Sequence, residues 1–465
     1  MSSLASPPSL ETIVALAKRR GFIFPTSEIY GGLANSYDYG PLGAQLLKNI
    51  RDSWWRDFVT RREDVVGLDS AIILPPQTWV ASGHVGSFTD PLVEDKVTHK
   101  RYRADHLIEA WRAAQGEQAA AVDVSSLSTA DMGALIQRHN LRSPAGNPIT
   151  EPKDFNILFE TGIGSVAGEK SIAYLRGETA QGIFTNFRQV VDALHLKLPF
   201  GIGQIGKSFR NEITTGQFIF RTLEFEQAEL EYFFGPDETP WRPLFESWQD
   251  AMWRFVHGRL GIQADHLRWR RHSDRERSHY STDTYDLDYL FPFGWKELWG
   301  IAYRTDYDLR QHMQHSGQSL EYIDPQTGRR IIPHVIEPAV GLNRLLLMVL
   351  CDAYWQDDER KRAVLRLKPA LAPYKAAVFP LVKNKPELVD YARRIFEELP
   401  VVWDTRGNIG KRYLAQDEIG TPFCVTVDYQ TLDDHTVTIR RRDDASQERV
   451  AVAQLAAYLR DGCRG

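Results

Sequence analysis

Cysteine is scarce in this sequence, long apolar runs are missing, and neither sign of charge dominates. The three cysteines, Cys351, Cys424 and Cys463, are widely spaced, which argues against a disulfide framework and favours a reducing compartment. The longest apolar runs, such as residues 345–350, are far too short to cross a membrane. The first residues lack the charged and apolar segments of a signal peptide. We therefore expect a cytoplasmic protein with no membrane partner.

The composition is that of an ordinary folded protein. Hydrophobic residues make up 43 % of the chain and charged residues 25 %, which excludes a disordered or collagen-like chain. The net charge of −5 argues against a protein that coats nucleic acid over its whole surface, although it leaves room for a local basic groove. At roughly 150 residues per domain, the 465 residues correspond to about three domains, or to fewer domains with large insertions.

Two helices and a strand are predicted near the N-terminus. Ser9 can cap a helix whose apolar residues follow a 3.6-residue period until Gly21. Gly40-Pro41 opens a second helix that continues to Phe58, and residues 65–74 indicate a strand. This apolar helix–strand pair suits either the core of the protein or the seam of a dimer.

The chain divides near residues 364–374, where a proline-containing linker is predicted. Beyond it, apolar strands alternate with short helices, which indicates a separate α/β domain over residues 370–465. Residues 1–365 form the larger domain. Within it, the stretches at about 88–155 and 235–290 look like insertions because their composition differs from that of the flanking segments.

A phosphate-binding motif occurs at Gly201–Ser208, which matches both G-x-x-x-x-G-K-[ST] and G-x-G-x-x-G. In a P-loop this motif must run into a helix, whose N-terminal N–H groups hold the phosphate. Residues 209–229 instead alternate like strands and break at Thr214-Thr-Gly216, which predicts a β-hairpin. A P-loop ATPase is therefore an unfavoured alternative.

This predicted hairpin is unusually charged. Arg210 and Glu212 share one face of its first strand, and the returning strand carries charge on both of its faces. One face of that strand holds Phe220, Thr222, Glu224, Glu226 and Ala228, and the other holds Arg221, Leu223, Phe225, Gln227 and Glu229. A buried strand cannot carry such charge without partners, so the hairpin is either exposed or lines a charged site.

A second charged stretch runs from Glu337 to Arg344, where a strand meets a helix. An arginine in the first helical turn opposes the helix dipole, and this costs free energy unless an anion offsets it. The two stretches together resemble motifs of the class II aminoacyl-tRNA synthetases: 209–229 resembles motif 2, 337–344 resembles motif 3, and 40–76 resembles the dimer-forming motif 1. Further stretches narrow the resemblance to the dimeric type of glycyl-tRNA synthetase, namely 20–32, 37–43, 79–84, 175–182 and 416–428.

The resemblance implies a fold and a reaction. The fold would be an α+β catalytic domain built on an antiparallel six-stranded-core sheet, followed by a C-terminal α/β anticodon-binding domain. Glycine and ATP would give glycyl-adenylate, and the glycyl group would pass to the 3′ end of tRNA(Gly). The implied partners are tRNA(Gly), glycine, ATP with Mg²⁺ and a second copy of the chain, which would join through the helix–strand of residues 40–76.

The resemblance also implies roles for individual residues in ATP binding. Arg210 would hold the α-phosphate, while Phe225 and Arg344 would clasp the adenine ring, and the two arginines would be the catalytic residues. Glu297 would hold the Mg²⁺ that accompanies ATP. The implied ATP-binding residues are Arg210, Asn211, Glu212, Phe220, Arg221, Thr222, Leu223, Glu224, Phe225, Glu297, Leu298, Gly341, Leu342, Asn343 and Arg344.

Glycine has no side chain to grip, so its ammonium and carboxylate groups must carry recognition. Glu178, Glu229 and Glu337 are the matched carboxylates for the ammonium, and Arg103 is the matched cation of the first insertion. A pocket closed around the α-carbon would exclude alanine, because one extra methyl is worth only about 1–3 kcal/mol by affinity. The implied glycine-binding residues are Arg103, Glu178, Phe225, Glu226, Gln227, Ala228, Glu229, Glu337, Pro338, Ala339, Val340 and Gly341.

Three departures from the family pattern keep a second function open. Family members usually carry Arg where Leu223 stands, Ser where Ala339 stands and Asp where Asn343 stands. A non-catalytic, synthetase-like tRNA-binding protein is therefore the alternative hypothesis. Some relatives have a zinc knuckle in the first insertion, but residues 95–100 contain no cysteine, so we expect no zinc.

Two basic runs are candidate tRNA contacts, although each could equally be a solvated surface. One comprises Arg268, Arg270, Arg271, Arg275 and Arg277, and the other comprises Arg440, Arg441 and Arg442. Anticodon contacts are expected within residues 407–413 and 416–418.

Overall fold

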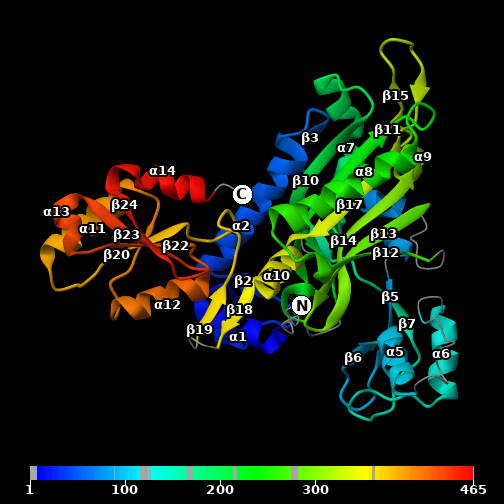
Figure 1. Ribbon diagram of the computed structural model, residues 1–465. Coiled ribbons are helices and arrows are strands. Elements are labelled where there is room, and N and C mark those ends of the chain that lie inside the picture. Colours follow the sequence, from blue (N-terminus) through cyan, green and yellow to red (C-terminus); the bar gives the residue numbers. More distant parts are fainter. Residues whose placement is uncertain are drawn as a thin grey trace.

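The computed structural model describes residues 8–87, 89–115, 124, 127–164, 171–212, 217–273, 281–358 and 362–463. Figure 1 shows a large sheet-based domain, a small domain projecting from it (cyan) and a C-terminal domain on the other side (orange and red). None of the helices among these described residues is both long and apolar enough to cross a membrane.

The N-terminal helices form as the sequence predicts. Helix α1 (Leu10–Arg20) begins at Ser9, whose hydroxyl accepts a hydrogen bond from the Thr12 backbone N–H, and ends at Gly21 in the left-handed conformation. Helix α2 (Pro41–Trp55) continues as a π-helical segment, η2 (Arg56–Thr60), so the expected helix to Phe58 is confirmed. Between them lies a hairpin of β1 (Ile23–Pro25) and β2 (Tyr37–Tyr39), whose loop contains the short helix η1 (Glu28–Tyr30).

The large domain is built on a seven-stranded sheet of order β12-β13-β14-β17-β11-β10-β3. Neighbouring strands are antiparallel from β12 to β10, and β3 joins the edge parallel to β10. The strands are β3 (Val65–Gly67), β10 (Phe200–Phe209), β11 (Glu224–Phe234), β12 (Leu267–Arg271), β13 (Asp283–Phe291), β14 (Gly294–Thr305) and β17 (His334–Gly341).

Two predictions for this domain were wrong. The single strand expected over 65–74 is two strands, because β4 (Ile73–Leu74) leaves the main sheet and pairs with β9 (Ser171–Leu175) and β8 (Glu160–Ile163). Residues 235–290 are not an insertion: β12 and β13 belong to the main sheet, and helix α8 (Trp241–Trp253) packs Phe245, Trp248 and Met252 into the core.

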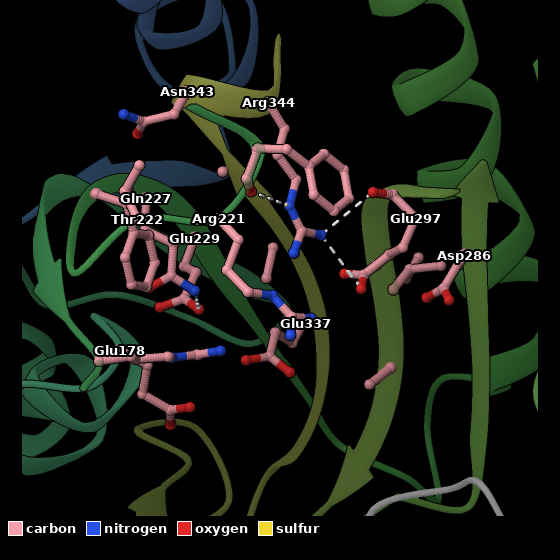
Figure 2. A pocket seen from close by; sticks show the side chains of 18 of the residues that line it. Glu178, Arg221, Thr222, Gln227, Glu229, Asp286, Glu297, Glu337, Asn343 and Arg344 are labelled. Atoms are coloured by element: carbon pink, nitrogen blue, oxygen red, sulfur yellow. Dashed lines mark hydrogen bonds and ion pairs between the residues drawn. The ribbon is translucent and has the colours of Figure 1, made fainter. Parts of the chain in front are cut away.

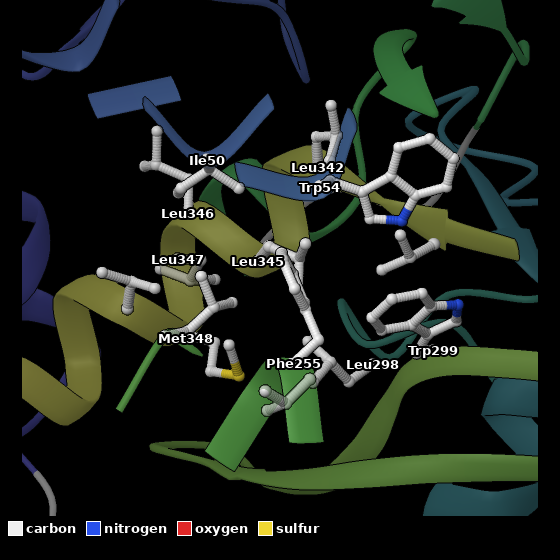
Figure 3. Close-up of a cluster of buried hydrophobic side chains, with 14 of the residues drawn as sticks. Ile50, Trp54, Phe255, Leu298, Trp299, Leu342, Leu345, Leu346, Leu347 and Met348 are labelled. Carbon is white, nitrogen blue, oxygen red and sulfur yellow. The ribbon is translucent and has the colours of Figure 1, made fainter. Parts of the chain in front are cut away.

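The core lies between the sheet and helix α10 (Leu342–Ala353), as Figure 3 shows. This helix is apolar on every side because it packs both on the sheet and on α2; all of its residues except Arg344 and Asp352 are buried. From α2 come Ile50 and Trp54, and Trp54 stacks on Phe58 with a centroid distance of 5.3 Å. Full burial of each large apolar side chain stabilises the fold by about 1.5–3 kcal/mol.

The motif Gly201–Ser208 lies inside strand β10, so it is not a phosphate-binding loop. Its glycines serve close packing instead. A Cβ at Gly203 would lie 2.9 Å from Val59 Cγ2, and one at Gly206 would lie 2.0 Å from Nη2 of the buried Arg176. This overturns the P-loop reading.

The hairpin starts earlier than predicted. Strand β10 ends at Phe209 and β11 begins at Glu224, so Arg210 and Glu212 lie in the connection rather than on a strand. That connection includes the 3₁₀ turn η5 (Phe218–Phe220), and the expected break at Thr214–Gly216 falls outside the described residues.

The first insertion is a small domain with a core of its own. Strands β6 (Arg101–Arg103), β5 (Thr89–Glu94) and β7 (Lys153–Asn156) form a sheet beside helices α5 (Ala104–Gln115) and α6 (Thr129–Arg138). At its tip the buried carboxylate of Asp95 accepts hydrogen bonds from Ser143, Asn147 and two backbone N–H groups. These bonds keep the pKa of Asp95 well below its usual range, although burial alone would raise it.

The C-terminal domain is an α/β unit with sheet order β21-β20-β22-β23-β24, and Figure 1 shows helices packed on this sheet. The hairpin β18 (Tyr354–Asp357) and β19 (Arg362–Leu365) leads into it. Its strands are β20 (Ala376–Pro380), β21 (Val402–Trp403), β22 (Phe423–Val427), β23 (Thr436–Arg441) and β24 (Gln447–Ala451); its helices are α11 (Pro386–Glu398), α12 (Ile409–Ile419), α13 (Tyr429–Asp434) and α14 (Val452–Gly462).

Residues 416–418 hold the domains together instead of facing solvent. Asp417 is fully buried between Arg362 and Arg440, and Glu418 forms ion pairs with both Arg19 and Arg20 of α1. Gln416 is buried too and accepts a hydrogen bond from Thr421. The expected anticodon contacts at 416–418 were therefore wrong.

The basic runs are also largely engaged within the protein. Arg440 and Arg442 are buried, and only Arg441 of that run is exposed. Arg268, Arg270 and Arg271 form ion pairs with aspartates of the adjacent strand β13, namely Asp288, Asp286 and Asp283. Arg275 and Arg277 fall outside the described residues.

Candidate active site

A pocket of about 270 Å³ opens on the face of the sheet where β11, β14 and β17 lie side by side (Figure 2). Phe225, Gln227 and Glu229 point into it from β11 because alternate residues of a strand share a face. Glu337, Ala339 and Gly341 do the same from β17, and Arg344 enters from the first turn of α10. The pocket therefore joins the two charged stretches that the sequence singles out.

Two arginines lie over aromatic rings at the pocket wall. The Arg344 guanidinium carbon is 4.4 Å from the centroid of Phe220, and that of Arg210 is 5.3 Å from the centroid of Phe225. Nε of Arg344 donates to the Phe220 carbonyl at 3.3 Å, and Nε of Arg210 donates to the Gly177 carbonyl at 2.9 Å. These contacts fix planar cations beside flat apolar surfaces, an arrangement suited to a base and its phosphates.

A pair of carboxylates lies on the opposite wall. Glu297 of β14 forms an ion pair with Arg344, with 3.2 Å between Oε2 and Nη1. Asp286 of β13 lies 2.7 Å from His272, measured between Oδ2 and Nε2. Desolvation and the nearby Glu297 raise the pKa of Asp286, whereas Arg344 holds the pKa of Glu297 below its usual value against the opposing effect of desolvation.

These two carboxylates fit a hard cation such as Mg²⁺, which prefers carboxylate and phosphate oxygens. The described residues contain no group of three or more potential ligands, so a cation here would need further oxygens from a bound phosphate. That is the arrangement expected of a metal that arrives with a nucleotide.

The floor of the pocket is a buried network of acids around one guanidinium. Arg304 forms a bidentate pair with Asp308 and also donates to both oxygens of Glu337, all at 2.8–2.9 Å. Glu178 lies 3.2 Å from Nε2 of His84 and accepts a hydrogen bond from Gln181. Burial alone would raise the pKa of Glu178, but His84 and Arg304 lower it well below its usual range.

Glu229 differs from these neighbours because its partners are uncharged. One oxygen accepts from the backbone N–H of Thr179 at 2.8 Å and from its hydroxyl, and the other accepts from the Gln227 amide. Burial, with Glu178 and Glu337 nearby, raises the pKa of Glu229 to about 8. Burial likewise raises the pKa of Glu337 to about 7, although Arg304 opposes the shift.

Comparison with known proteins assigns both parts of the chain. The family described as anticodon binding domain matches residues 375–462, within the expected 370–465. Glycine–tRNA ligase of Acetivibrio thermocellus is 50 % identical over 461 residues, covering 97 % of this chain and 98 % of the relative. The enzyme of the same name from Geobacillus thermodenitrificans is 50 % identical, and the match covers 97 % of this chain and 97 % of the relative. The one from Caldanaerobacter subterraneus subsp. tengcongensis is 49 % identical, and the match covers 97 % of this chain and 98 % of the relative.

This chain belongs to the glycine–tRNA ligase family. Its C-terminal domain is an anticodon-binding domain, and its mixed α/β content fits a class II synthetase.

Most residues that the resemblance implies for this ligase family line the pocket. They are Glu178, Arg210, Glu212, Phe220, Arg221, Thr222, Phe225, Gln227, Glu229, Glu297, Glu337, Ala339, Gly341, Asn343 and Arg344. Phe225 and Arg344, which should clasp one purine, thus border the same cavity (Figure 2 shows Arg344 beside Glu297).

Other residues predicted for the site lie outside the pocket, mostly because they occupy the opposite face of a strand. Glu226 points toward α2 and pairs with Arg51, with 3.2 Å between its Oε1 and the arginine Nε. Ala228, Val340, Leu298 and Leu342 are buried in the core, and Arg103 forms ion pairs with Asp90 and Asp105. Asn211, Leu223, Glu224 and Pro338 are likewise absent from the lining.

Sequence reasoning missed two residues that line the ligase pocket, Asp286 and His272, and two that lie behind its lining, Arg304 beside Glu337 and His84 beside Glu178. Arg304 could not be found by alternation from Glu297, because a register shift opposite Leu287 and Asp288 interposes an extra residue, Leu298, in β14. The strand therefore changes the parity of its inward-facing residues between Glu297 and Arg304.

Asn343, one of the departures from the family pattern, uses both the oxygen and the nitrogen of its side-chain amide in contacts. Its oxygen accepts from the Glu226 backbone N–H at 2.7 Å, and its nitrogen contacts the Tyr39 hydroxyl. The Leu223 backbone N–H donates to the Asn35 carbonyl at 2.9 Å, and the Leu223 side chain is not among those lining the pocket. The N-terminal hairpin thus supports the connection after β10 and the start of α10.

Proposed function

We propose that this protein is a glycine–tRNA ligase, which activates glycine with ATP and transfers it to the 3′ end of tRNA(Gly). The observation that carries the proposal is one pocket that combines two arginine–aromatic contacts with a floor of buried carboxylates, in a chain that is 50 % identical to a glycine–tRNA ligase over 97 % of its length. The anticodon-binding domain supports tRNA as the second substrate.

In the first step the glycine carboxylate attacks the α-phosphorus of ATP and pyrophosphate leaves. This displacement needs alignment and neutralised charge more than it needs a protein base. Arg210 neutralises the α-phosphate, and the adenine lies between Phe225 and Arg344, which can contact the base and a terminal phosphate together because its guanidinium is planar.

The Mg²⁺ that accompanies ATP would neutralise phosphate charge, and Glu297 with Asp286 would hold it. Both carboxylates line the pocket, and the pKa of Asp286 is raised by desolvation and the charge of Glu297, which is the repulsion that a bound cation relieves. ATP must also replace the contact of Arg344 with Glu297.

The carboxylate floor supports glycine as the amino acid. Glu178, Glu229 and Glu337 line the part of the pocket that lies below Arg344 in Figure 2, where an ammonium group would be surrounded by acceptors. Gly300, Ala302 and Ala339 also line the cavity and limit its size with backbone rather than with flexible side chains. A small pocket of this kind suits an amino acid without a side chain.

We further propose a homodimer formed through residues 40–76. Several apolar side chains on and beside this segment are exposed in the single chain, namely Ile72, Ile73, Ile163 and Ile172, and all lie on or next to the sheet of β4, β9 and β8. Exposed apolar groups in neighbouring strands are typical of surfaces that a partner covers.

A synthetase-like protein that binds tRNA without forming adenylate is the second candidate, motivated by Leu223, Ala339 and Asn343. An assay of pyrophosphate exchange into ATP with each of the twenty amino acids separates the two. If the protein is the ligase, glycine should support exchange. Arg344→Ala should slow this exchange about a hundredfold or more. Arg310→Ala, a control on the exposed face of α9 (Tyr307–Ser316), should leave it intact. Wild-type protein that binds tRNA but supports no exchange would favour the second candidate.

A further inference from the structure

The buried floor of the pocket contains more acids than cations. Glu178, Glu229, Glu231, Glu337 and Asp308 are all buried there, and Arg304 pairs with two of them, Glu337 and Asp308. His84 accompanies Glu178. Among the described residues, Glu229 and Glu231 have no ion-pair partner, and both oxygens of Glu231 lack any hydrogen bond.

Unpaired buried carboxylates are costly to ionise, so an acid in such a place keeps its proton. Glu229 lines the cavity, whereas Glu231 does not. Of these two acids, only Glu229 can therefore contact a bound ligand. The charged groups that face Glu229 are Glu178 from the segment before α7 (Ala180–Leu194), Glu337 from β17, Glu231 from its own strand, Arg210 from the connection after β10 and Arg176 from the segment after β9. Three of these five are acids. Of the two cations, Arg210 rests on Phe225, and Arg176 donates its hydrogen bonds to the carbonyls of Lys207 and Ser70.

We propose that Glu229 carries a proton in the free protein and gives it up when the substrate's ammonium group binds, so that amino-acid binding releases one proton to solvent. This inference rests on the proposed function and names the carboxyl group that takes up the ammonium charge. The exchange balances: the protonated acid and the glycine zwitterion become an ion pair, and the O–H proton of Glu229 leaves to water. Glu178 and Glu337 keep the partners that they already have, His84 and Arg304.

Proton release predicts a pH-dependent affinity. Below the pKa of Glu229, which burial and neighbouring acids raise to about 8, glycine must displace a proton, and its affinity should rise by up to tenfold per pH unit. Above that pKa the free protein is already ionised, so the affinity should level off. An acid that is ionised throughout would give no such dependence between pH 6 and 8.

Isothermal titration calorimetry of glycine into the full chain tests this directly. At pH 7, titrations in phosphate and in Tris buffer should differ in heat by the amount that corresponds to about one proton released, and the difference should shrink toward zero at pH 9. Equal heats in both buffers at pH 7 would overturn the inference while leaving the ligase function standing. Absence of glycine binding together with absence of glycine-dependent exchange would overturn both.

Two variants assign the proton. Glu229→Gln keeps the size of the side chain but has no proton to release, so the buffer difference should vanish and glycine affinity should fall at least tenfold. Glu226→Gln is the matched control, because Glu226 is a buried carboxyl on the opposite face of the same strand and its pKa is also raised by burial. It should leave the proton count unchanged. Proton release that persists in Glu229→Gln would place the proton on another acid and refute the assignment.

Discussion

Arg344 and Glu297 neutralise each other across the pocket, with 3.2 Å between Nη1 and Oε2. Arg344 is proposed to bind ATP, and Glu297 is proposed to bind the Mg²⁺ that accompanies it. Nucleotide binding must therefore break the ion pair between them. We expect Arg344→Ala to slow glycine-dependent pyrophosphate exchange about a hundredfold or more, the usual effect of removing a group that stabilises transition-state charge. Arg344→Lys should recover little of this loss, because an ammonium cannot lie flat over a ring.

Glu297→Gln should change the metal dependence rather than adenine binding. The amide keeps a hydrogen-bond acceptor for Arg344 but loses the charge that attracts Mg²⁺. We expect the Mg²⁺ concentration that supports half-maximal exchange to rise several-fold. Glu224→Gln, which affects an exposed carboxylate paired with Lys207 outside this pocket, is the control. An unchanged Mg²⁺ requirement in Glu297→Gln would remove Glu297 from the metal site.

The free protein should lose stability as pH rises from about 5 to about 8. The pKa of Glu229 is about 8 in the folded state, so the folded protein binds more protons than the unfolded chain over this window. Each such group lowers the free energy of unfolding by up to about 1.4 kcal/mol per pH unit. Urea denaturation at several pH values measures the slope, which Glu229→Gln should reduce. A slope identical in the variant would contradict this origin.

Gly206→Ala should destabilise the fold even though no phosphate binds there. The new Cβ would lie 2.0 Å from Nη2 of Arg176, whose buried guanidinium is held by the Lys207 carbonyl and by Ser70. We expect a loss of about 1–3 kcal/mol in the free energy of unfolding, as in other overpacked cores. Gly258→Ala, where nothing lies within 4 Å of the added atom, should cost nothing. Equal stabilities of the two variants would be inconsistent with this packing.

Glu418→Ala should loosen the attachment of the C-terminal domain, because this carboxylate pairs with both Arg19 and Arg20. We expect faster proteolysis between residues 366 and 375 and a several-fold higher KM for tRNA, with glycine-dependent exchange unchanged. Glu28→Ala removes an exposed ion pair at Lys18 of the same helix and should affect neither measurement. A parallel loss of exchange in Glu418→Ala would show that the contact acts on the catalytic domain instead.

Local pattern was enough to place much of this site. Strand alternation put Phe225, Gln227 and Glu229 on one face, and the structure finds them lining one pocket. Alternation failed where the strand itself is irregular. The extra residue at Leu298 changes which residues of β14 face the pocket, so counting from Glu297 does not lead to Arg304, whose side chain donates to Glu337. This irregularity is a property of the pairing between strands rather than of either strand alone.

Charge runs misled for a different reason. Arg440 and Arg442 look like an exposed basic patch, yet both are buried, because Asp417 and backbone carbonyls of Gly420 and Leu367 accept their hydrogen bonds. Those partners are distant in sequence, so composition cannot reveal them. Residues 235–290 were misassigned as an insertion for the same reason, since their strands complete a sheet whose other members come from elsewhere in the chain.

The hairpin that ends at Tyr39 reaches the pocket from the other end of the chain. The Tyr39 hydroxyl contacts Asn343, and the Asn35 carbonyl accepts a hydrogen bond from the Leu223 backbone N–H, while Ile29 and Tyr30 of the same hairpin loop are exposed. Proteolytic removal of this hairpin, or a rigid fusion partner beside it, would therefore disturb the supports of Asn343 and Leu223 at the proposed nucleotide site. The removed residues would themselves not contact ATP. A loss of activity after such a change would arise indirectly, through the lost support of the site. Preparations of this protein are therefore best compared with their first forty residues intact.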